Sequence, residues 1–141
     1  MAVINKKPFA IENDHPWGVD IDDTLLLWDV PLNTPGVLVV EFQEPHLKEL
    51  TRAVVNENNL RLMKEKKERG CFIILWSQGG YEYATHVAKA LHINHYIDII
   101  MTKPVGLIDD LPSSAWLPQP VNIPYTKNYK TPNLKGDTNG I

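Results

Sequence analysis

The chain has 141 residues, of which 43% are hydrophobic and 22% are charged, close to the average of globular proteins. This length predicts a single domain with a hydrophobic core of its own. The net charge of −3 and the pI near 5.9 argue against an extensive nucleic-acid surface, but they are compatible with contact to a single phosphate. The sequence has no apolar signal segment at its start and no stretch of membrane-spanning length, so we expect a cytoplasmic protein without membrane contact.

Short apolar runs alternate with segments of helical spacing along most of the chain. We expect core strands at about residues 17–22, 71–76, 97–101 and 105–108, a short strand at 9–11, a β-hairpin from 37–42 and 51–55, and helices at 57–69 and 81–91. Asn56 is a suitable N-cap for the first helix, and Gly70 a stop. This order predicts an α/β fold with right-handed crossovers, a Rossmann-like doubly wound parallel sheet and a β-hairpin after the first strand.

The composition changes towards the C-terminus, where residues 112–141 hold five of the eleven prolines. We therefore divide the chain into one domain, residues 1–117, and an extended Pro-rich tail, residues 118–141. Such a tail either wraps its own domain or docks on a neighbouring chain, and the second case would make the protein a homo-oligomer.

Three carboxylates, those of Asp20, Asp22 and Asp23, interrupt the apolar run of the first strand. Ionised groups with apolar flanks are costly unless they are compensated, and a bound cation is a common compensation. Residues i and i+2 of an extended segment point to the same side, so Asp20 and Asp22 are expected to converge where the strand ends. Two such carboxylates can divide the work of phosphoryl transfer, one as nucleophile or metal ligand and the other moving a proton.

At these residues the chain resembles the haloacid dehalogenase (HAD) superfamily, whose first motif is an apolar strand followed by Asp-x-Asp-x-Thr. That motif stands here as Asp20-Ile21-Asp22-Asp23-Thr24. The later motifs of the family follow in order: an apolar strand ending in Ser77, a lysine at Lys103, and a paired acid at Asp109-Asp110. The matched region spans roughly residues 16 to 111. The resemblance implies that the hairpin after the first motif is a flap beside the site.

The resemblance implies roles for these acids. Asp20 would be the nucleophile that becomes a transient aspartyl-phosphate, and Asp22 would protonate the leaving oxygen and then activate water. The implied cofactor is Mg²⁺, which prefers hard oxygen ligands. Asp20, the backbone carbonyl of Asp22 and Asp109 would hold it, with Asp110 acting through water or by steering Asp109; which of the last two acids touches the metal stays open.

The resemblance also implies a phosphate-binding set. Ser77, with Gln78 and Gly79 at the start of a helix, would donate hydrogen bonds to phosphate oxygens. Lys103 would neutralise charge on the phosphate and on Asp20. Only five residues separate Lys103 from Asp109, whereas many members of the family place a helix there. Thr24 is expected to support the loop of the first motif.

Neither interval between the motifs is long enough for a separate cap domain, so we expect an open site. These features predict a Mg²⁺-dependent phosphomonoester hydrolase, a HAD-type phosphatase acting on a phosphorylated small molecule or a phosphate on a macromolecule. Three alternatives stay open: a phosphotransferase, a polynucleotide 3′-phosphatase, and a catalytically silent binding module with the HAD fold.

Overall fold

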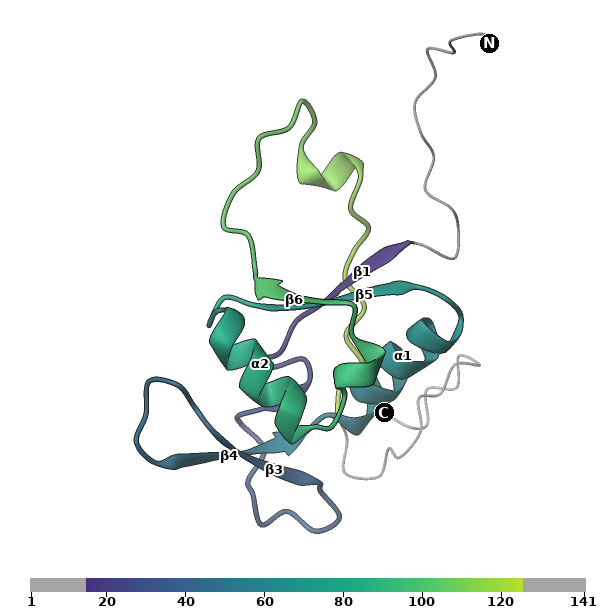
Figure 1. Ribbon diagram of the computed structural model, residues 1–141. Coiled ribbons are helices and arrows are strands. Elements are labelled where there is room, and N and C mark those ends of the chain that lie inside the picture. The colour runs from purple at the N-terminus through teal and green to yellow at the C-terminus, as the bar shows by residue number, and fades with distance from the viewer. Residues whose placement is uncertain (1–14, 126–141) are drawn as a thin grey trace, which may run out of the picture.

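The computed structural model describes residues 15–125 (Figure 1), so the expected strand at residues 9–11 and most of the expected tail lie outside the described residues. The elements in chain order are β1 (Pro16–Val19), β2 (Leu26–Leu27), β3 (Val39–Gln43), β4 (Leu50–Val55), α1 (Glu57–Glu68), β5 (Phe72–Ser77), α2 (Tyr81–Ala90), the 3₁₀-helix η2 (Asn94–Tyr96), β6 (Ile99–Thr102) and the 3₁₀-helix η3 (Ser113–Ala115). No helix within residues 15–125 is long and apolar enough to cross a membrane.

The main sheet consists of β1, β5 and β6, which run parallel in that order. Val19 lies opposite Leu75, and Ser77 lies opposite Thr102. Because the strands follow chain order across the sheet, right-handed crossovers place both helices on the same face (Figure 1). Ile73 and Leu75, which point to that face, are fully buried in one core cluster with residues of α1 and α2. Helices on both faces, as a doubly wound sheet requires, are not found within residues 15–125.

The opposite face of the main sheet is apolar and only partly buried. It carries Phe72, Ile74 and Trp76 of β5, which alternate with the buried residues of the same strand. Trp76 lies across Gly18 of β1 so closely that a Cβ atom on Gly18 would stand 2.3 Å from the indole. A glycine is therefore required in β1 for Trp76 to cover the neighbouring strand.

A smaller antiparallel sheet, ordered β2-β4-β3, lies below α2 (Figure 1). β3 and β4 form the predicted hairpin, with Val40 opposite Ala53 and Gln43 opposite Leu50. Phe42 packs edge-on against Tyr83 of α2, with their ring centroids 5.9 Å apart. This contact fixes the hairpin against the helix that follows Ser77, and so places the hairpin beside the carboxyl ends of the parallel strands.

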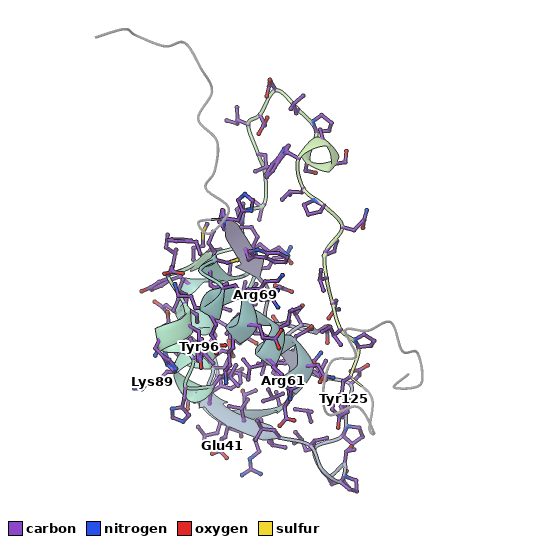
Figure 2. All side chains as sticks on the ribbon, turned by 90° about the vertical axis from the view of Figure 1, so that its right-hand side faces the viewer. Glu41, Arg61, Arg69, Lys89, Tyr96 and Tyr125 are labelled. Atoms are coloured by element: carbon purple, nitrogen blue, oxygen red, sulfur yellow. The ribbon has the colours of Figure 1, made fainter. Side chains whose placement is uncertain are left out.

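The first turn of α1 and its cap make hydrogen bonds to the Asp loop and to the C-terminal segment. Asn56 caps the helix as predicted, since its side chain accepts hydrogen bonds from the N–H groups of Asn58 and Asn59. Asn59 donates to the carbonyl of Thr24 at 2.9 Å and accepts from the N–H of Ile123 at 2.9 Å, while Asn56 donates to the Ile123 carbonyl. The described part of the predicted tail thus docks on its own domain (Figure 2).

The predicted strand at residues 105–108 is wrong. This segment belongs to a loop that follows β6 and stands away from the sheet and helices (Figures 1 and 2). Val105 is 97% exposed and Ile108 fully exposed. The apolar run suggested a strand, but Pro104 has no N–H to donate to a ladder and Gly106 weakens strand formation. β6 remains an edge strand within the described residues.

Candidate active site

The loop from Asp20 to Thr24 begins directly after β1 and is held by one buried backbone carbonyl. Ile21 is fully buried, and its carbonyl accepts hydrogen bonds from the N–H groups of Thr24, Leu25 and Leu26 at 2.8 to 3.1 Å. Asp23 adopts a φ of +59°, in the left-handed region that Asp and Asn tolerate better than most side chains. The first strand therefore ends at Val19, earlier than predicted, and the acids lie on a compact turn.

Asp20 lies at the carboxyl edge of the parallel sheet, next to a hydroxyl and an ammonium group. The hydroxyl of Thr24 donates to Asp20 Oδ2 at 3.3 Å, in agreement with the supporting role predicted for Thr24. Lys103 Nζ lies 3.9 Å from Asp20 Oδ1, and both side chains are about one-third exposed. Lys103 reaches this position because β6 pairs with β5, so that the residue after Thr102 follows the edge of the sheet next to Ser77. Lys103 and Asp20 therefore lie within ion-pair distance of each other at this edge.

Ser77 ends β5 and links the strand to the start of α2. Its Oγ accepts a hydrogen bond from the N–H of Gly79 at 2.9 Å, and its carbonyl accepts from the N–H of Lys103 at 2.9 Å. Ser77 is buried, whereas Gln78 and Gly79 are exposed at the surface of the same turn. Gly80, with a φ of +104°, leads into α2. The turn therefore brings the predicted phosphate-binding residues to the same edge as Asp20, and the Ser77 hydroxyl proton remains available for donation.

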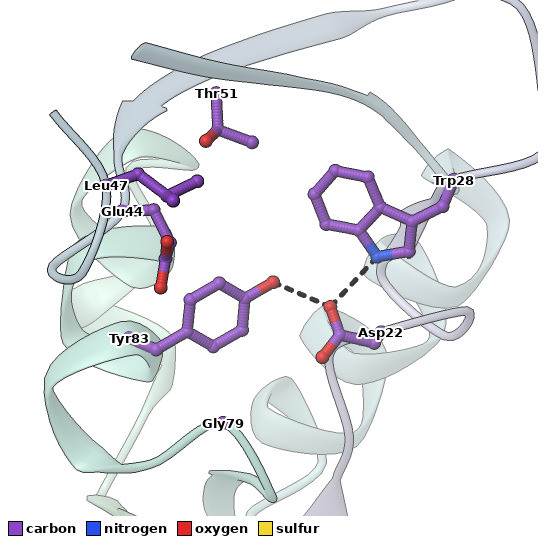
Figure 3. A pocket seen from close by; sticks show the side chains of 7 residues that line it. All are labelled: Asp22, Trp28, Glu44, Leu47, Thr51, Gly79 and Tyr83. Carbon is purple, nitrogen blue, oxygen red and sulfur yellow. Dashed lines mark hydrogen bonds between the residues drawn. The ribbon is translucent and has the colours of Figure 1, made fainter. Parts of the chain in front are cut away.

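Asp22 has partners quite different from those of Asp20. Its Oδ1 accepts a hydrogen bond from the hydroxyl of Tyr83 at 2.6 Å and a second from the indole Nε1 of Trp28 at 2.9 Å (Figure 3). Burial raises the pKa of the Tyr83 hydroxyl well above its usual range, and the bond to Asp22 and the charge of nearby carboxylates raise it further. Tyr83 therefore stays protonated and donates to Asp22, which leaves Asp22 Oδ2 as the oxygen free to carry a proton.

A pocket of about 340 Å³ opens beside Asp22, between the hairpin and the start of α2. Figure 3 shows Trp28 on one side of it and Glu44, Leu47 and Tyr83 on the other. The complete lining is Asp22, Trp28, Glu44, Leu47, Thr51, Gly79 and Tyr83. The hairpin predicted to act as a flap thus forms one wall of a pocket that ends at a candidate catalytic carboxylate.

The acid pair predicted to complete a metal centre is not part of this cluster. Asp109 and Asp110 are exposed on the loop after β6, and Asp109 Oδ1 accepts a hydrogen bond from the N–H of Leu111. That bond lowers the pKa of Asp109. Residues 15–125 contain no group of three or more His, Cys, Asp or Glu side chains that could hold a metal ion. Asp20 and Asp22 offer hard oxygens of the kind that Mg²⁺ prefers, but the described residues do not form the ligand set that the resemblance implies.

Sequence reasoning missed Tyr83 and Glu44. Tyr81 and Tyr83 both lie in the first turn of α2, but Tyr81 is 55% exposed and Tyr83 takes the inward position. The position of Gly80 could have indicated this arrangement. Because α2 begins directly after Gly80, Tyr83 is the third residue of the helix, and this residue faces the Asp loop. Trp28, which follows the apolar run Leu25–Leu27, is 44% exposed and lines the same pocket.

Comparison of the chain with models of protein families, with curated proteins and with solved structures gave no match.

Proposed function

We propose that this protein is a phosphomonoester hydrolase of the HAD type that forms an aspartyl-phosphate on Asp20. The observation that carries the proposal is the convergence of Asp20, Lys103 and the Ser77–Gly80 turn at one edge of a parallel sheet, with Asp22 held two residues away. Ligands bind at this edge in open α/β sheets. The Rossmann-like classification and the absence of a cap domain belong to the same proposal, and the parallel strand order and the short hairpin support them.

In the first step a carboxylate oxygen of Asp20 attacks phosphorus and the bond to the ester oxygen breaks. The ester oxygen keeps the electron pair and takes a proton from Asp22 Oδ2, so that an alcohol leaves. In the second step Asp22 removes a proton from water, the water oxygen attacks phosphorus, and the acyl-phosphate bond breaks to restore the Asp20 carboxylate. Tyr83 and Trp28 hold Asp22 by its other oxygen in both steps.

Charge balance makes a cation relevant to this proposal. Asp20 and Asp22 lie where a phosphate dianion would arrive, Glu44 lines the adjoining pocket, and Lys103 is a cationic partner of Asp20. A divalent cation would offset the repulsion between these carboxylates and the phosphate. Because the described residues supply only part of a Mg²⁺ ligand set, the dependence of turnover on Mg²⁺ is to be measured.

The test is release of phosphate from a simple phosphomonoester, with and without Mg²⁺, by the wild type and three variants. Asp20→Asn keeps the size of the side chain but removes the nucleophile, so turnover should vanish. Asp22→Asn should lower turnover by about 10²- to 10⁴-fold, the usual contribution of general acid–base catalysis. Asp23→Asn is the matched control, because Asn also tolerates the left-handed backbone at this position, and it should keep wild-type turnover.

Equal turnover in the wild type and Asp20→Asn would refute the nucleophile. The phosphotransferase alternative predicts that an added alcohol acceptor receives the phosphoryl group in place of water, which product analysis detects. The silent binding module predicts no turnover in any variant.

A further inference from the structure

The pocket beside Asp22 has a composition that selects a particular leaving group. We propose, resting on the hydrolase function above, that it binds the nucleobase of a free nucleoside monophosphate. The pocket opens at the carboxylate that would protonate the leaving oxygen, so the alcohol part of a substrate would lie in it while the phosphate lies at Asp20. Its volume of about 340 Å³ is within the range of small-ligand sites.

Trp28 supplies the flat surface that a nucleobase needs. Its indole is 44% exposed, yet its orientation is fixed because Nε1 donates to Asp22 at 2.9 Å. A large aromatic ring that is both exposed and held in place is well suited to stacking. Because the indole is already ordered, binding of a heterocycle costs little side-chain conformational entropy.

The opposite wall selects for hydrogen-bond donors. Glu44 presents a carboxylate, which accepts hydrogen bonds, and Thr51 presents a hydroxyl, while Leu47 provides an apolar contact (Figure 3). An amino-substituted heterocycle such as adenine offers N–H groups to Glu44 and an apolar face to Trp28.

Charge favours a free mononucleotide over a nucleic-acid end. Glu44 and Asp22 both line the pocket, so a second phosphate entering there would meet two carboxylates. The chain as a whole carries a net charge of −3, which gives no attraction to a polyanion.

The experiment compares kcat/KM for adenosine 5′-monophosphate and ribose 5-phosphate, which both carry the phosphate on the primary 5-hydroxyl of ribose and differ in whether a base is part of the leaving alcohol. The wild type should prefer the nucleotide by about fivefold to about a hundredfold, as expected for stacking of one base on an aromatic side chain. Trp28→Leu should bring the ratio close to one. Trp28→Phe should keep most of the ratio, because it retains a ring and loses only the hydrogen bond to Asp22.

Trp116→Leu is the matched control, since Trp116 is 47% exposed and lies in the loop after β6, and it should keep the wild-type ratio. A ratio that is unchanged in Trp28→Leu, or close to one in the wild type, would overturn the proposal. Better turnover of a 5′-phosphorylated oligonucleotide than of the mononucleotide would overturn the choice of a free nucleotide.

If no ester is hydrolysed, equilibrium dialysis with adenosine and with ribose separates the two proposals. Binding of adenosine that Trp28→Leu abolishes would support the pocket while the hydrolase proposal fails. No binding of adenosine by the wild type would refute the pocket itself.

Discussion

Replacing Asn59 by alanine should release the Asp loop and the C-terminal segment together. Asn59 is 5% exposed, and its amide makes three hydrogen bonds: to the Thr24 carbonyl at 2.9 Å, to Asn122 at 2.7 Å and from the N–H of Ile123 at 2.9 Å. Alanine removes all three and leaves the Thr24 carbonyl without this donor. A net hydrogen bond contributes about 0.5–1.5 kcal/mol and a buried unpaired group costs about 1–3 kcal/mol, so the unfolding free energy should fall by about 2–4 kcal/mol.

Urea denaturation measures this loss as a lower midpoint at an unchanged m-value. The variant should also lose protection of the Ile123 amide in hydrogen exchange, because Asn59 Oδ1 is the acceptor for that N–H. Asn94→Ala, at an exposed position in η2, is the control and should stay within about 0.5 kcal/mol of the wild type. A loss for Asn59→Ala as small as that of the control, with Ile123 still protected, would refute the tethering role.

Two further predictions concern β6 and the loop that follows it. Asp98 precedes β6, and its carboxylate accepts from Lys67 Nζ at 2.8 and 2.9 Å and from the N–H of Ile73 at 2.8 Å. The bond to Lys67 lowers the pKa of Asp98 from its usual 3.8, so this stabilisation is complete above that value and is lost as the pH falls through the lower, folded-state pKa. Asp98→Asn should therefore cost about 1 kcal/mol at pH 7 and flatten the acid side of the stability curve, and a curve parallel to that of the wild type would contradict it. Ile108→Ser should change the unfolding free energy by less than about 0.5 kcal/mol because Ile108 is fully exposed, and a loss above about 1 kcal/mol would show that this side chain packs in solution.

Local signals in the sequence were sufficient to predict most of the elements. The cap at Asn56, the stop at Gly70 and the hairpin of β3 and β4 depend on neighbours along the chain, and each of them is where it was expected. How far each face of the main sheet is buried could not be predicted from local signals. An apolar run such as that of β5 indicates a strand buried on both faces, whereas here the second face is only partly covered.

The sequence was sufficient to place the candidate site at the carboxyl edge of the parallel sheet, but not to predict the side-chain contacts within it. Residues that follow parallel strands meet at one edge, which is why Asp20, Ser77 and Lys103 lie together there. Asp20 and Asp22 have different hydrogen-bond partners, because β1 ends at Val19 and the chain turns between the two acids. One partner of Asp22, Tyr83, is 61 residues away, and its position depends on how α2 packs against the hairpin.

The spacing between Lys103 and Asp109 sets a limit on where the acid pair can be. Six residue steps span at most about 20 Å of extended chain, and Lys103 Nζ lies 3.9 Å from Asp20. Asp109 is therefore within reach of the Asp loop by chain length, although the described loop directs it into solvent. The same loop exposes several large apolar side chains, and contiguous exposed apolar surface generally marks a place of contact. Ile108 precedes Asp109 directly, so an arrangement that brought Asp109 to Asp20 and buried Ile108 would make Ile108→Ser lower the unfolding free energy by more than about 1 kcal/mol, whereas the exposed loop predicts a change below about 0.5 kcal/mol.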